Sequence, residues 1–393
     1  METLRFFLTT TFYPPYHIGG DAVHVKYLAE ELAKKGHEVH VFHSLDAYGL
    51  KRKNASKEAK YFGVHTHPIQ TPFKSSSYLA YSLGGSNSVN RKFKFLAKEM
   101  KPDVVHHHNI SLLGYKILAK QNAYINLYTA HDYWLICQQN NLMKNGSDVC
   151  TNASCFLCSL RCARPPQIWR HWGEFEEAIS EIDCIVAPSD YLRKRVAEKK
   201  HARIVTIPNF VPRPPADIAP SGFSNFFLYA GVLEKHKGIL SLVDLFAESK
   251  VDAKLLIVGH GSLGHKIRES VKKFGSEDKI LLLDWVDRDL LYRLLNDANA
   301  LVLPSIWPEN SPLIILEALS VGTPAIASNI GGIPEVIERV NGKLMFDDLE
   351  RLKDMLLGFS KKDFSSERIR CVYEKYFSPE AYIRKYFETI RSI

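Results

Sequence analysis

The 393-residue sequence has no run of about 18 apolar residues, the length that marks a membrane-spanning helix. Residues 1–11 read as a short strand and lack the basic, apolar and small-residue order of a signal peptide. The excess of positive charge is small, because 51 Lys and Arg against 43 Asp and Glu give +8. Solvated lysines account for most of it, and attraction to anionic lipid or a phosphorylated substrate is the sharper alternative. We therefore expect a cytoplasmic protein that has no nucleic-acid partner.

What is present is the composition of a soluble globular chain, with 46% hydrophobic and 24% charged residues. A chain of 393 residues is too long for one ordinary core, so two α/β domains are expected. Five prolines between 208 and 220 indicate an interdomain linker, which we place at 208–225. On either side, over 1–207 and 226–376, strand-like apolar runs alternate with helical patterns. This alternation predicts two doubly wound parallel sheets.

One stretch of the second half combines a helix start with two carboxylates. Ser311 followed by Pro312 is typical of a helix N-cap with proline at the first helical position. Glu309 then lies in the loop before the helix, and Glu317 about two turns along it. Free amides at a helix start suit a phosphate, and carboxylates accept hydrogen bonds from sugar hydroxyls. A buried helix with two incidental glutamates is the alternative for this fragment alone.

The wider motif resembles the nucleotide-sugar site of retaining family 4 glycosyltransferases. The two glutamates are followed by Glu-Ala-Leu at 317–319, by Gly-Thr-Pro-Ala-Ile-Ala at 322–327 and by Gly-Gly-Ile-Pro-Glu at 331–335. Members of that family have the GT-B fold, in which two Rossmann-like domains face a central cleft. The resemblance is specific over 309–334 and extends more weakly over nearly the whole chain. It implies that the first domain binds the acceptor and is joined by a C-terminal helix at 377–393, while the second binds the donor.

The resemblance also implies the reaction. A retaining hexosyltransferase of this type moves a sugar from a nucleotide diphosphate sugar, such as a UDP-sugar, to a hydroxyl of a glycan or lipid-linked glycan in polysaccharide or glycolipid biosynthesis. No carboxylate is obviously placed as a nucleophile, so we expect attack from the face of the leaving group, whose phosphate takes the acceptor proton. No cofactor is expected to be required for catalysis.

Roles follow from the residues that match the motif. In the family, the arginine of Gly-Arg-Leu and the lysine of Lys-Gly together neutralise the diphosphate. Lys237 matches the lysine, but Val232 replaces the arginine, and Lys235 is the candidate to compensate. Glu309 would hold the donor sugar and Glu317 the ribose. The expected catalytic residues are His131, Glu309 and Lys237, and the expected donor-binding residues are Gly19, Gly20, Lys235, Gly259, Val286, Ser311, Leu313, Ile314 and Glu317.

Val286 follows a predicted strand at 280–283, where the family places the nucleobase. The next residues, Asp287-Arg288-Asp289, resemble a metal-binding Asp-x-Asp motif. They also begin a helical pattern, and negative charge at a helix N-terminus explains them without a metal.

In the first half, Gly19 and Gly20 lie between a predicted strand and a helix, an arrangement typical of phosphate binding. A plain tight turn is the alternative. His131 follows the strand at 125–129, at the sheet edge where active sites of α/β folds lie. It matches the family's cleft histidine, and a structural turn histidine is the alternative. The histidines at 106–108 alternate between the two faces of a strand, which favours core or cleft-edge positions over one shared metal ion.

Residues 88–101 combine basic and aromatic residues in a helical pattern. Such a helix can lie on a membrane surface, and packing of a normal helix on its sheet is the alternative.

Five of the seven cysteines lie between 137 and 162. A Cys-x2-Cys pair with flanking cysteines has metal-like spacing in a cytosolic chain. We expect a structural zinc ion, less readily an iron–sulfur cluster, held by four of these thiolates. Free buried thiols are the main alternative, and a disulfide is disfavoured by a reducing cytosol. The expected ligands are Cys150, Cys155, Cys158 and Cys162, with Cys137 as the alternative ligand.

Three other functions remain open from the sequence. A nucleotide-sugar epimerase of the same architecture would also use glycines and histidines, although its motifs fit 309–319 less well. A degenerate transferase that serves as a scaffold or partner subunit would account for Val232. A phosphorylase would need a lysine-bound cofactor, for which the sequence carries no signal.

Overall fold

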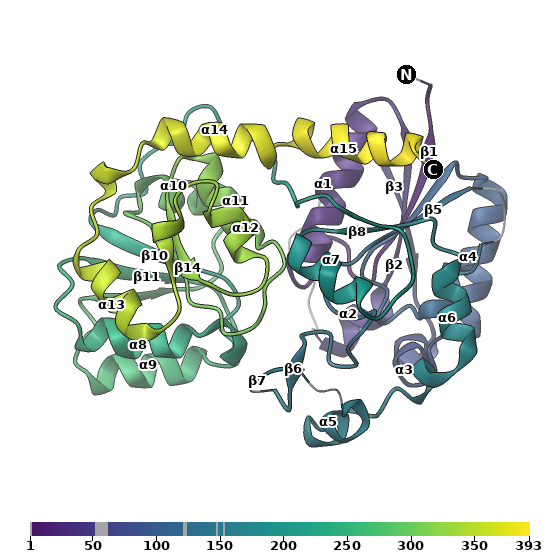
Figure 1. Ribbon diagram of the computed structural model, residues 1–393, viewed down its shortest axis with the longest axis horizontal. Coiled ribbons are helices and arrows are strands. Elements are labelled where there is room, and N and C mark those ends of the chain that lie inside the picture. Colours follow the sequence, from purple (N-terminus) through teal and green to yellow (C-terminus); the bar gives the residue numbers. More distant parts are fainter. Residues whose placement is uncertain (1, 52–61, 121–123, 147, 152–153) are drawn as a thin grey trace. The chain divides into compact units, whose positions relative to one another are not determined.

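The computed structural model describes residues 2–51, 62–120, 124–146, 148–151 and 154–393. The chain forms two compact units, one of residues 1–208 with 383–393 and the other of residues 209–382 (Figure 1). Each unit is built around its own parallel sheet. The expectation of two doubly wound parallel α/β domains is confirmed.

The sheet of the first unit has the strand order β3-β2-β1-β4-β5-β8-β9, and every pairing is parallel. Its strands are β1 (Arg5–Thr9), β2 (Glu38–Ser44), β3 (Val64–Ile69), β4 (Val104–His107), β5 (Ile125–Thr129), β8 (Cys184–Ala187) and β9 (Ile204–Thr206). Its helices are α1 (Gly20–Lys34), α2 (Leu45–Lys51), α3 (Ser75–Leu83), α4 (Asn87–Met100), α5 (Cys155–Arg161), α6 (Gly173–Ser180) and α7 (Asp190–Ala197). A short antiparallel hairpin, β6 (Met143–Lys144) and β7 (Asp148–Val149), lies outside this sheet.

The sheet of the second unit has the order β12-β11-β10-β13-β14-β15 and is also parallel. Its strands are β10 (Phe226–Ala230), β11 (Lys254–Val258), β12 (Ile280–Leu283), β13 (Leu301–Leu303), β14 (Ala325–Ser328) and β15 (Met345–Phe346). Its helices are α8 (Ile239–Glu248), α9 (Gly264–Lys273), α10 (Arg288–Asp297), α11 (Leu313–Ser320), α12 (Ile333–Ile337), α13 (Leu349–Leu357) and α14 (Ser366–Tyr376). Within this unit, α8 and α9 cover one face of the sheet, and α10 and α11 cover the other (Figure 1).

The central strands form because their residues are apolar without alternation. All five residues of β10 are buried, as expected for a strand covered by helices on both faces. In each sheet the order of strands reverses beside the first strand, at the β1–β4 pair and at the β10–β13 pair. Ligands of open α/β sheets bind outside the carboxyl ends of the strands at such a reversal. Functional side chains are therefore expected at these two places.

The last helix, α15 (Pro379–Arg391), crosses from the second unit into the first. Within the first unit its Tyr386 hydroxyl lies 2.9 Å from Nδ1 of His106, and its ring lies 6.3 Å from that of Phe6. The C-terminal residues 383–393 are thus part of the core of the first unit.

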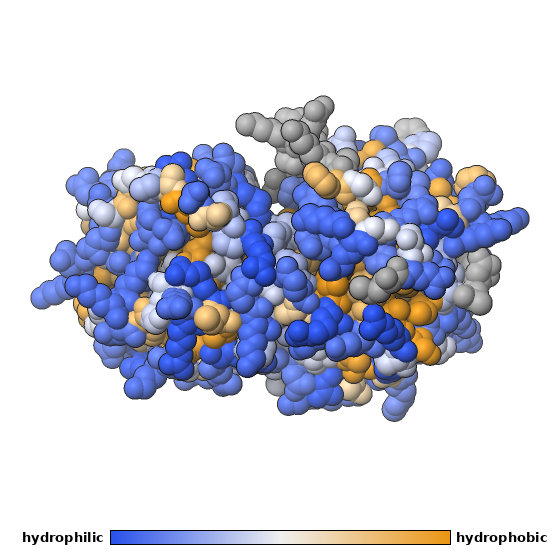
Figure 2. All heavy atoms as spheres, turned by 90° about the horizontal axis from the view of Figure 1, so that it is seen from above, coloured by the Kyte–Doolittle hydropathy of each residue, from blue (hydrophilic) through white to orange (hydrophobic). Residues whose placement is uncertain are grey.

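Helix α4 contains the basic segment that resembles a membrane-surface helix. Its apolar side faces the sheet, where Phe93 is buried and stacks on Phe7 with the ring centroids 5.4 Å apart. Phe95 is exposed beside the basic residues. On the face in Figure 2 the surface is mainly hydrophilic, with smaller apolar areas between. Among the described residues, no helix is both long and apolar enough to cross a bilayer.

Candidate active site

Three polar side chains converge where the second sheet reverses its order. Glu309 lies in the loop before α11, and its buried carboxylate accepts hydrogen bonds through Oε1 from the Lys237 ammonium and, at 2.7 Å, from the Ser305 hydroxyl. Lys237 ends the short 3-10 helix Lys235–Lys237 that follows β10, and Ser305 follows β13. The structure therefore brings together Lys237 and Glu309, which are 72 residues apart in the sequence.

Opposing effects set the pKa of Glu309. Burial on its own raises the pKa, while the charge and hydrogen bond of Lys237 and the hydrogen bond from Ser305 lower it. The net pKa lies below the ordinary value of a glutamate. Glu309 is therefore a carboxylate, an acceptor of hydrogen bonds, at neutral pH.

Two glycines allow the backbone to come close around this ion pair. Gly331 has φ +65°, and a Cβ placed on it would lie 2.3 Å from the carbonyl oxygen of Glu309. The next amide, that of Gly332, donates to the same carbonyl at 2.6 Å. Gly238 has φ +67°, and its Cβ would lie 1.9 Å from the carbonyl oxygen of Pro304. Any residue with a side chain would push these loops apart.

The start of α11 differs from the sequence prediction. The helix begins at Leu313, and the cap position is taken by Pro312, whose ψ of 118° is extended. Ser311 therefore stands one residue before the cap, too early for its hydroxyl to reach the first amides, so the predicted Ser311 cap is wrong. The Ser311 hydroxyl is buried and has no hydrogen-bond partner among the described residues. In the sequence, Ser311 stands two and three residues before Leu313 and Ile314, whose amides are the first of the helix.

A second ion pair lies further along α11. Glu317 is buried, and its Oε1 lies 3.1 Å from a guanidinium nitrogen of Arg288 at the start of α10. Arg288 also donates to the hydroxyl of Tyr292 at 2.8 Å. Burial raises the pKa of Glu317, and Arg288 only partly offsets this, so the pKa stays above its ordinary value. Arg288 could not be predicted as this partner from the sequence, because the contact depends on how α10 packs on α11.

Asp287 has the structural role that its position at a helix start suggested. It is the cap of α10 and accepts a hydrogen bond from the amide of Leu290 at 2.9 Å. Among the described parts of the chain, no three or more His, Cys, Asp or Glu side chains are grouped so that they could hold a metal ion.

The remaining donor-site candidates of the second unit lie at the carboxyl ends of its strands. Val232 is partly exposed after β10, and its carbonyl accepts from the Tyr229 hydroxyl at 2.8 Å. Lys235 is exposed, and Val286 is partly buried beside the exposed Trp285. Gly259 directly follows β11. These positions follow β10, β11 and β12 at the same edge of the sheet, and their contacts do not fix their roles.

In the first unit, Gly19 is the cap residue of α1, which begins at Gly20. Asp21, in the first turn, accepts a hydrogen bond from the Asn109 side chain at 2.6 Å. This bond joins the start of α1 to the loop after β4 at the edge where this sheet reverses its order. The first amides of α1 lie at that edge.

His131 belongs to a group of imidazoles. Its Nε2 lies 3.0 Å from Nδ1 of His108, and its ring centroid is 5.2 Å from that of His24. Burial lowers the pKa of His131 to about 3, so its imidazole is neutral at physiological pH. The three histidines at 106–108 are all buried, as predicted, and His106 bonds to Thr129 at 2.8 Å.

Asp132, next to His131, was missed as a candidate. Its carboxylate accepts the amide of Trp134 at 2.9 Å. Burial raises the pKa of Asp132 to about 7, and the hydrogen bond from Trp134 offsets only part of that effect. A titration near neutral pH is typical of functional carboxyl groups. The adjacency of histidine and aspartate after a buried strand was the only sequence signal for it.

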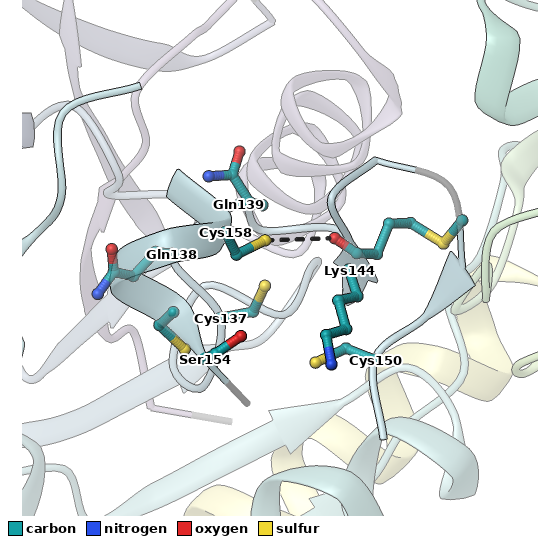
Figure 3. A pocket seen from close by; sticks show the side chains of 9 residues that line it. Cys137, Gln138, Gln139, Lys144, Cys150, Ser154 and Cys158 are labelled. Atoms are coloured by element: carbon teal, nitrogen blue, oxygen red, sulfur yellow. Dashed lines mark hydrogen bonds between the residues drawn. The ribbon is translucent and has the colours of Figure 1, made fainter. Parts of the chain in front are cut away.

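Four of the five clustered cysteines line one small pocket. They are Cys137, Cys150, Cys155 and Cys158, and Figure 3 shows the labelled thiols of three of them around the same space. Burial raises the pKa of the Cys137 and Cys155 thiols, and neighbouring thiols raise it further. Cys162 ends α5 and does not line the pocket.

Comparison with protein families identifies both halves of the chain. The family model described as glycosyltransferase family 4 matches residues 18–213. The model described as glycosyl transferases group 1 matches residues 216–361. The second match contains Lys237, Glu309 and Glu317.

Individual proteins agree with these matches. The N-acetyl-alpha-D-glucosaminyl L-malate synthase of Bacillus anthracis is 25% identical over 343 residues, which cover 84% of this chain and 80% of that protein. The structure of sucrose-phosphate synthase from Thermosynechococcus elongatus superposes with a TM-score of 0.72 at 19% identity, covering 99% of this chain and 98% of that one. Anabaena HepE, solved in complex with UDP and glucose, has a TM-score of 0.67 at 15% identity, covering 99% of this chain and 100% of that one. The GT-B fold expected from the sequence is confirmed by these structures.

Proposed function

Since the chain belongs to the family 4 glycosyltransferases, enzymes that transfer sugars, we propose that it moves the sugar of a nucleotide diphosphate sugar to a hydroxyl of a glycan or lipid-linked glycan, with retention of configuration. The observation that carries this proposal is the pair of the partly buried Lys237 and the buried Glu309 before α11. Glu309 brings the partly buried ammonium of Lys237 to the loop that leads to the Ser311 hydroxyl and the first amides of α11. A cation, free helix amides and a hydroxyl of this kind together suit a diphosphate. UDP-sugars are the first donors to test, because HepE was solved with UDP.

The proposed chemistry depends on stabilising the departing diphosphate. As the bond between the anomeric carbon and the diphosphate oxygen breaks, negative charge grows on the phosphate oxygens. Lys237, the amides of Leu313 and Ile314 and the Ser311 hydroxyl are donors fixed in place before that charge develops. Gly19 and Gly20 are the proposed phosphate contacts of the first unit.

The two glutamates are proposed to position the donor. Lys237 and Ser305 both bind Oε1 of Glu309, so we assign Oε2 to a hydroxyl of the transferred sugar. Arg288 binds Oε1 of Glu317, and the other oxygen is assigned to a ribose hydroxyl. His131, a neutral imidazole, is assigned to the transferred sugar as a hydrogen-bonding group.

Retention is proposed to follow from attack on the face that the diphosphate leaves. Glu309 is the carboxylate assigned to the reacting sugar, and its ion pair favours hydrogen bonding over nucleophilic attack. A leaving phosphate oxygen would accept the proton of the attacking hydroxyl. Lys235, exposed two residues before Lys237, is the proposed replacement for the cation that Val232 does not supply.

Contact with an anionic membrane surface is a subsidiary proposal for an enzyme whose acceptor is lipid-linked. Residues 88–101 would make it through the exposed, basic side of α4, which includes Phe95. Sedimentation of the protein with vesicles of anionic and of neutral lipid tests this contact. Equal amounts of protein in the two pellets would refute it.

The experiment that tests the function is an assay of nucleoside diphosphate release across a panel of nucleotide sugars, with and without candidate acceptors. Acceptor-dependent release together with an unchanged anomeric configuration in the product, determined by NMR, is the expected result. Conversion of the sugar without an acceptor would favour an epimerase. Donor binding without any turnover would favour a scaffold subunit. A product with inverted configuration would refute the proposed mechanism but keep the transfer.

A further inference from the structure

The cysteine pocket is formed by three separate segments of the first unit. Cys137 lies in the loop after β5, Cys150 directly follows β7, and Cys155 and Cys158 lie one turn apart on α5. Residues three apart on a helix share a face, so the two thiols of α5 point to the same side. The cavity between these segments measures about 20 Å³, room for one water-sized sphere or ion.

Among its described residues, this part of the chain buries few large apolar side chains, Leu142 and Met143 among them. On α5 the large apolar residues Phe156, Leu157 and Leu160 are all more than half exposed. The buried face of the same helix carries Cys158 and Ser159. The hairpin β6–β7 pairs over only two residues in each strand. A lobe of this kind needs another source of order, and bonds from several segments to one metal ion would provide it.

Donors and cations around the pocket would stabilise negative charge on its sulfur atoms, against the burial that favours the neutral thiols of Cys137 and Cys155. The amide of Asn145 donates to Sγ of Cys158 at 3.3 Å. Lys144 lines the pocket. The buried guanidinium of Arg170, held against Trp169 at 4.7 Å from the ring centroid, interacts electrostatically with Cys137 and Cys155. Four thiolates around a divalent cation carry a net charge of about −2, which these groups would offset.

We propose that Cys137, Cys150, Cys155 and Cys158 bind one zinc ion. Four thiol protons are released as four sulfur–zinc bonds form, and no oxidant or reductant takes part. Because no described group of ligands is already arranged for an ion, the thiols must turn inward until each sulfur lies about 2.3 Å from the metal. Spacing in the sequence favoured Cys162 as the fourth ligand, whereas the pocket favours Cys137.

The ion would fix a segment that leads directly to the candidate site. The amide of Cys137 donates to the carbonyl of Tyr133 at 2.8 Å, and the amide of Tyr133 donates to the carbonyl of Asn140 at 3.1 Å. This compact loop follows His131 and Asp132 in the chain. Zinc would therefore act as a positioning element for that loop and would not take part in sugar transfer.

The first test is elemental analysis of the full chain, purified without a metal-affinity step. About one zinc per chain is expected, with no visible absorption band. Thiol titration should find the four pocket cysteines unreactive in the folded protein until a strong chelator is added, whereas the exposed Cys371 should react at once. Absence of zinc with freely reactive pocket thiols would overturn the proposal. So would a visible iron–sulfur band, or a mass two daltons lower per disulfide formed.

The ligand set is tested by two matched substitutions on α5. Cys155→Ser should lose most of the bound zinc and lower the melting temperature. Cys162→Ser, seven residues on and at the end of the same helix, should keep the wild-type zinc content. The reverse pattern would restore Cys162 as a ligand and overturn the assignment of Cys137. Should Cys155→Ser fail to fold, zinc content and thiol accessibility of the wild type and of Cys162→Ser still decide the question.

Discussion

The two units have the same architecture but differ in the polar groups that they bury near the reversal of their sheets. The first unit buries neutral imidazoles, among them His106, His107 and His108. The second unit buries carboxylates held by cations, Glu309 by Lys237 and Glu317 by Arg288. Parallel sheets with a reversal of strand order place both groups at equivalent edges. The fold therefore supplies the location, and we propose that the buried side chains decide which unit handles an anionic ligand.

This difference agrees with the proposed division of labour. A diphosphate needs fixed positive charge and amides, and those are found around α11 in the second unit. Neutral histidines can donate or accept single hydrogen bonds to hydroxyl groups without a charge of their own. Such groups suit the contact with sugar that we assign to the first unit.

The largest effect is expected from removing Lys237, the cation that binds Glu309 in the second unit. Lys237→Met should lower the rate of sugar transfer by about 100- to 1000-fold, because a fixed charge facing the leaving group is lost. The substitution also leaves Glu309 buried without its partner, which costs about 3–5 kcal/mol of stability. Steady-state kinetics and thermal unfolding measure the two effects.

The double variant Lys237→Met/Glu309→Gln separates these effects. It removes both charges, so stability should largely recover while activity stays low. Lys272→Met, an exposed lysine on α9, is the control and should be unchanged. Recovery of activity in the double variant would mean that Lys237 has only a structural role.

The second effect concerns the close backbone contact beside Lys237. Gly238→Ala should destabilise the protein by about 3 kcal/mol or more, because the left-handed backbone is strained and the new Cβ meets the Pro304 carbonyl. Gly275→Ala is the matched control in the same unit, with φ +59° and nothing within 4 Å of a new Cβ. It should cost only about 1–2 kcal/mol. Equal losses in urea unfolding would show that the loop after Lys237 yields easily and does not fix the site.

The third effect tests the ion pair of Glu317. Arg288→Met removes the group that offsets the burial of this carboxyl, so the pKa of Glu317 should rise further. Donor affinity should fall by about 10- to 100-fold, the value of a charge-assisted hydrogen bond and its desolvated partner. Calorimetric titration with UDP measures it. The exposed pair of Arg268 and Asp284, 3.9 Å apart, provides the control Arg268→Met, which should bind donor normally.

The last effect is the response of the first unit to acid. It is the smallest effect at neutral pH and the one most specific to this unit. Burial lowers the pKa of His43 and His67 to about 4 and of His107 and His131 to about 3. At a pH between these lowered pKa values and the ordinary histidine pKa of 6.5, the unfolded chain binds more protons than the folded one. Stability from these groups is complete above about 6.5 and is lost as the pH falls.

Asp132 acts in the opposite direction, because its pKa, raised to about 7, makes the folded state take up a proton first as the pH falls. Four histidines outweigh this one carboxyl, so the first unit should open at a higher pH than the second. Hydrogen exchange of β1 and β10 between pH 7 and 5 compares the units. His265→Ala, an exposed position in the second unit, is the control. Earlier loss of protection in β10 would contradict the comparison.

The fold could be predicted from the sequence because apolar strands and helical patterns alternate visibly along the chain. The resemblance also grouped Lys237, Glu309 and Glu317 in one site, and the structure brings Lys237 against Glu309. Sequence reasoning missed Arg288 and Asp132, since a contact between two helices and the burial of one carboxyl depend on tertiary packing. It placed the start of α11 one residue too early, because the dihedral angles of Pro312 decide where the helix begins. Among the cysteines, nearness in sequence favoured Cys162, whereas the folded loop brings Cys137 to the pocket.

The most direct test of the account is amide hydrogen exchange of the wild-type enzyme with and without UDP. The account predicts slower exchange in the peptides that contain Lys237 and Gly238 and in those that contain Leu313 and Ile314, because a diphosphate would occupy their amides and the adjacent ammonium. Lys237→Met should lose this protection at the same UDP concentration. Saturating UDP that leaves these peptides unchanged, or that protects only strands and loops of the first unit, would contradict the assignment of the nucleotide to the second unit.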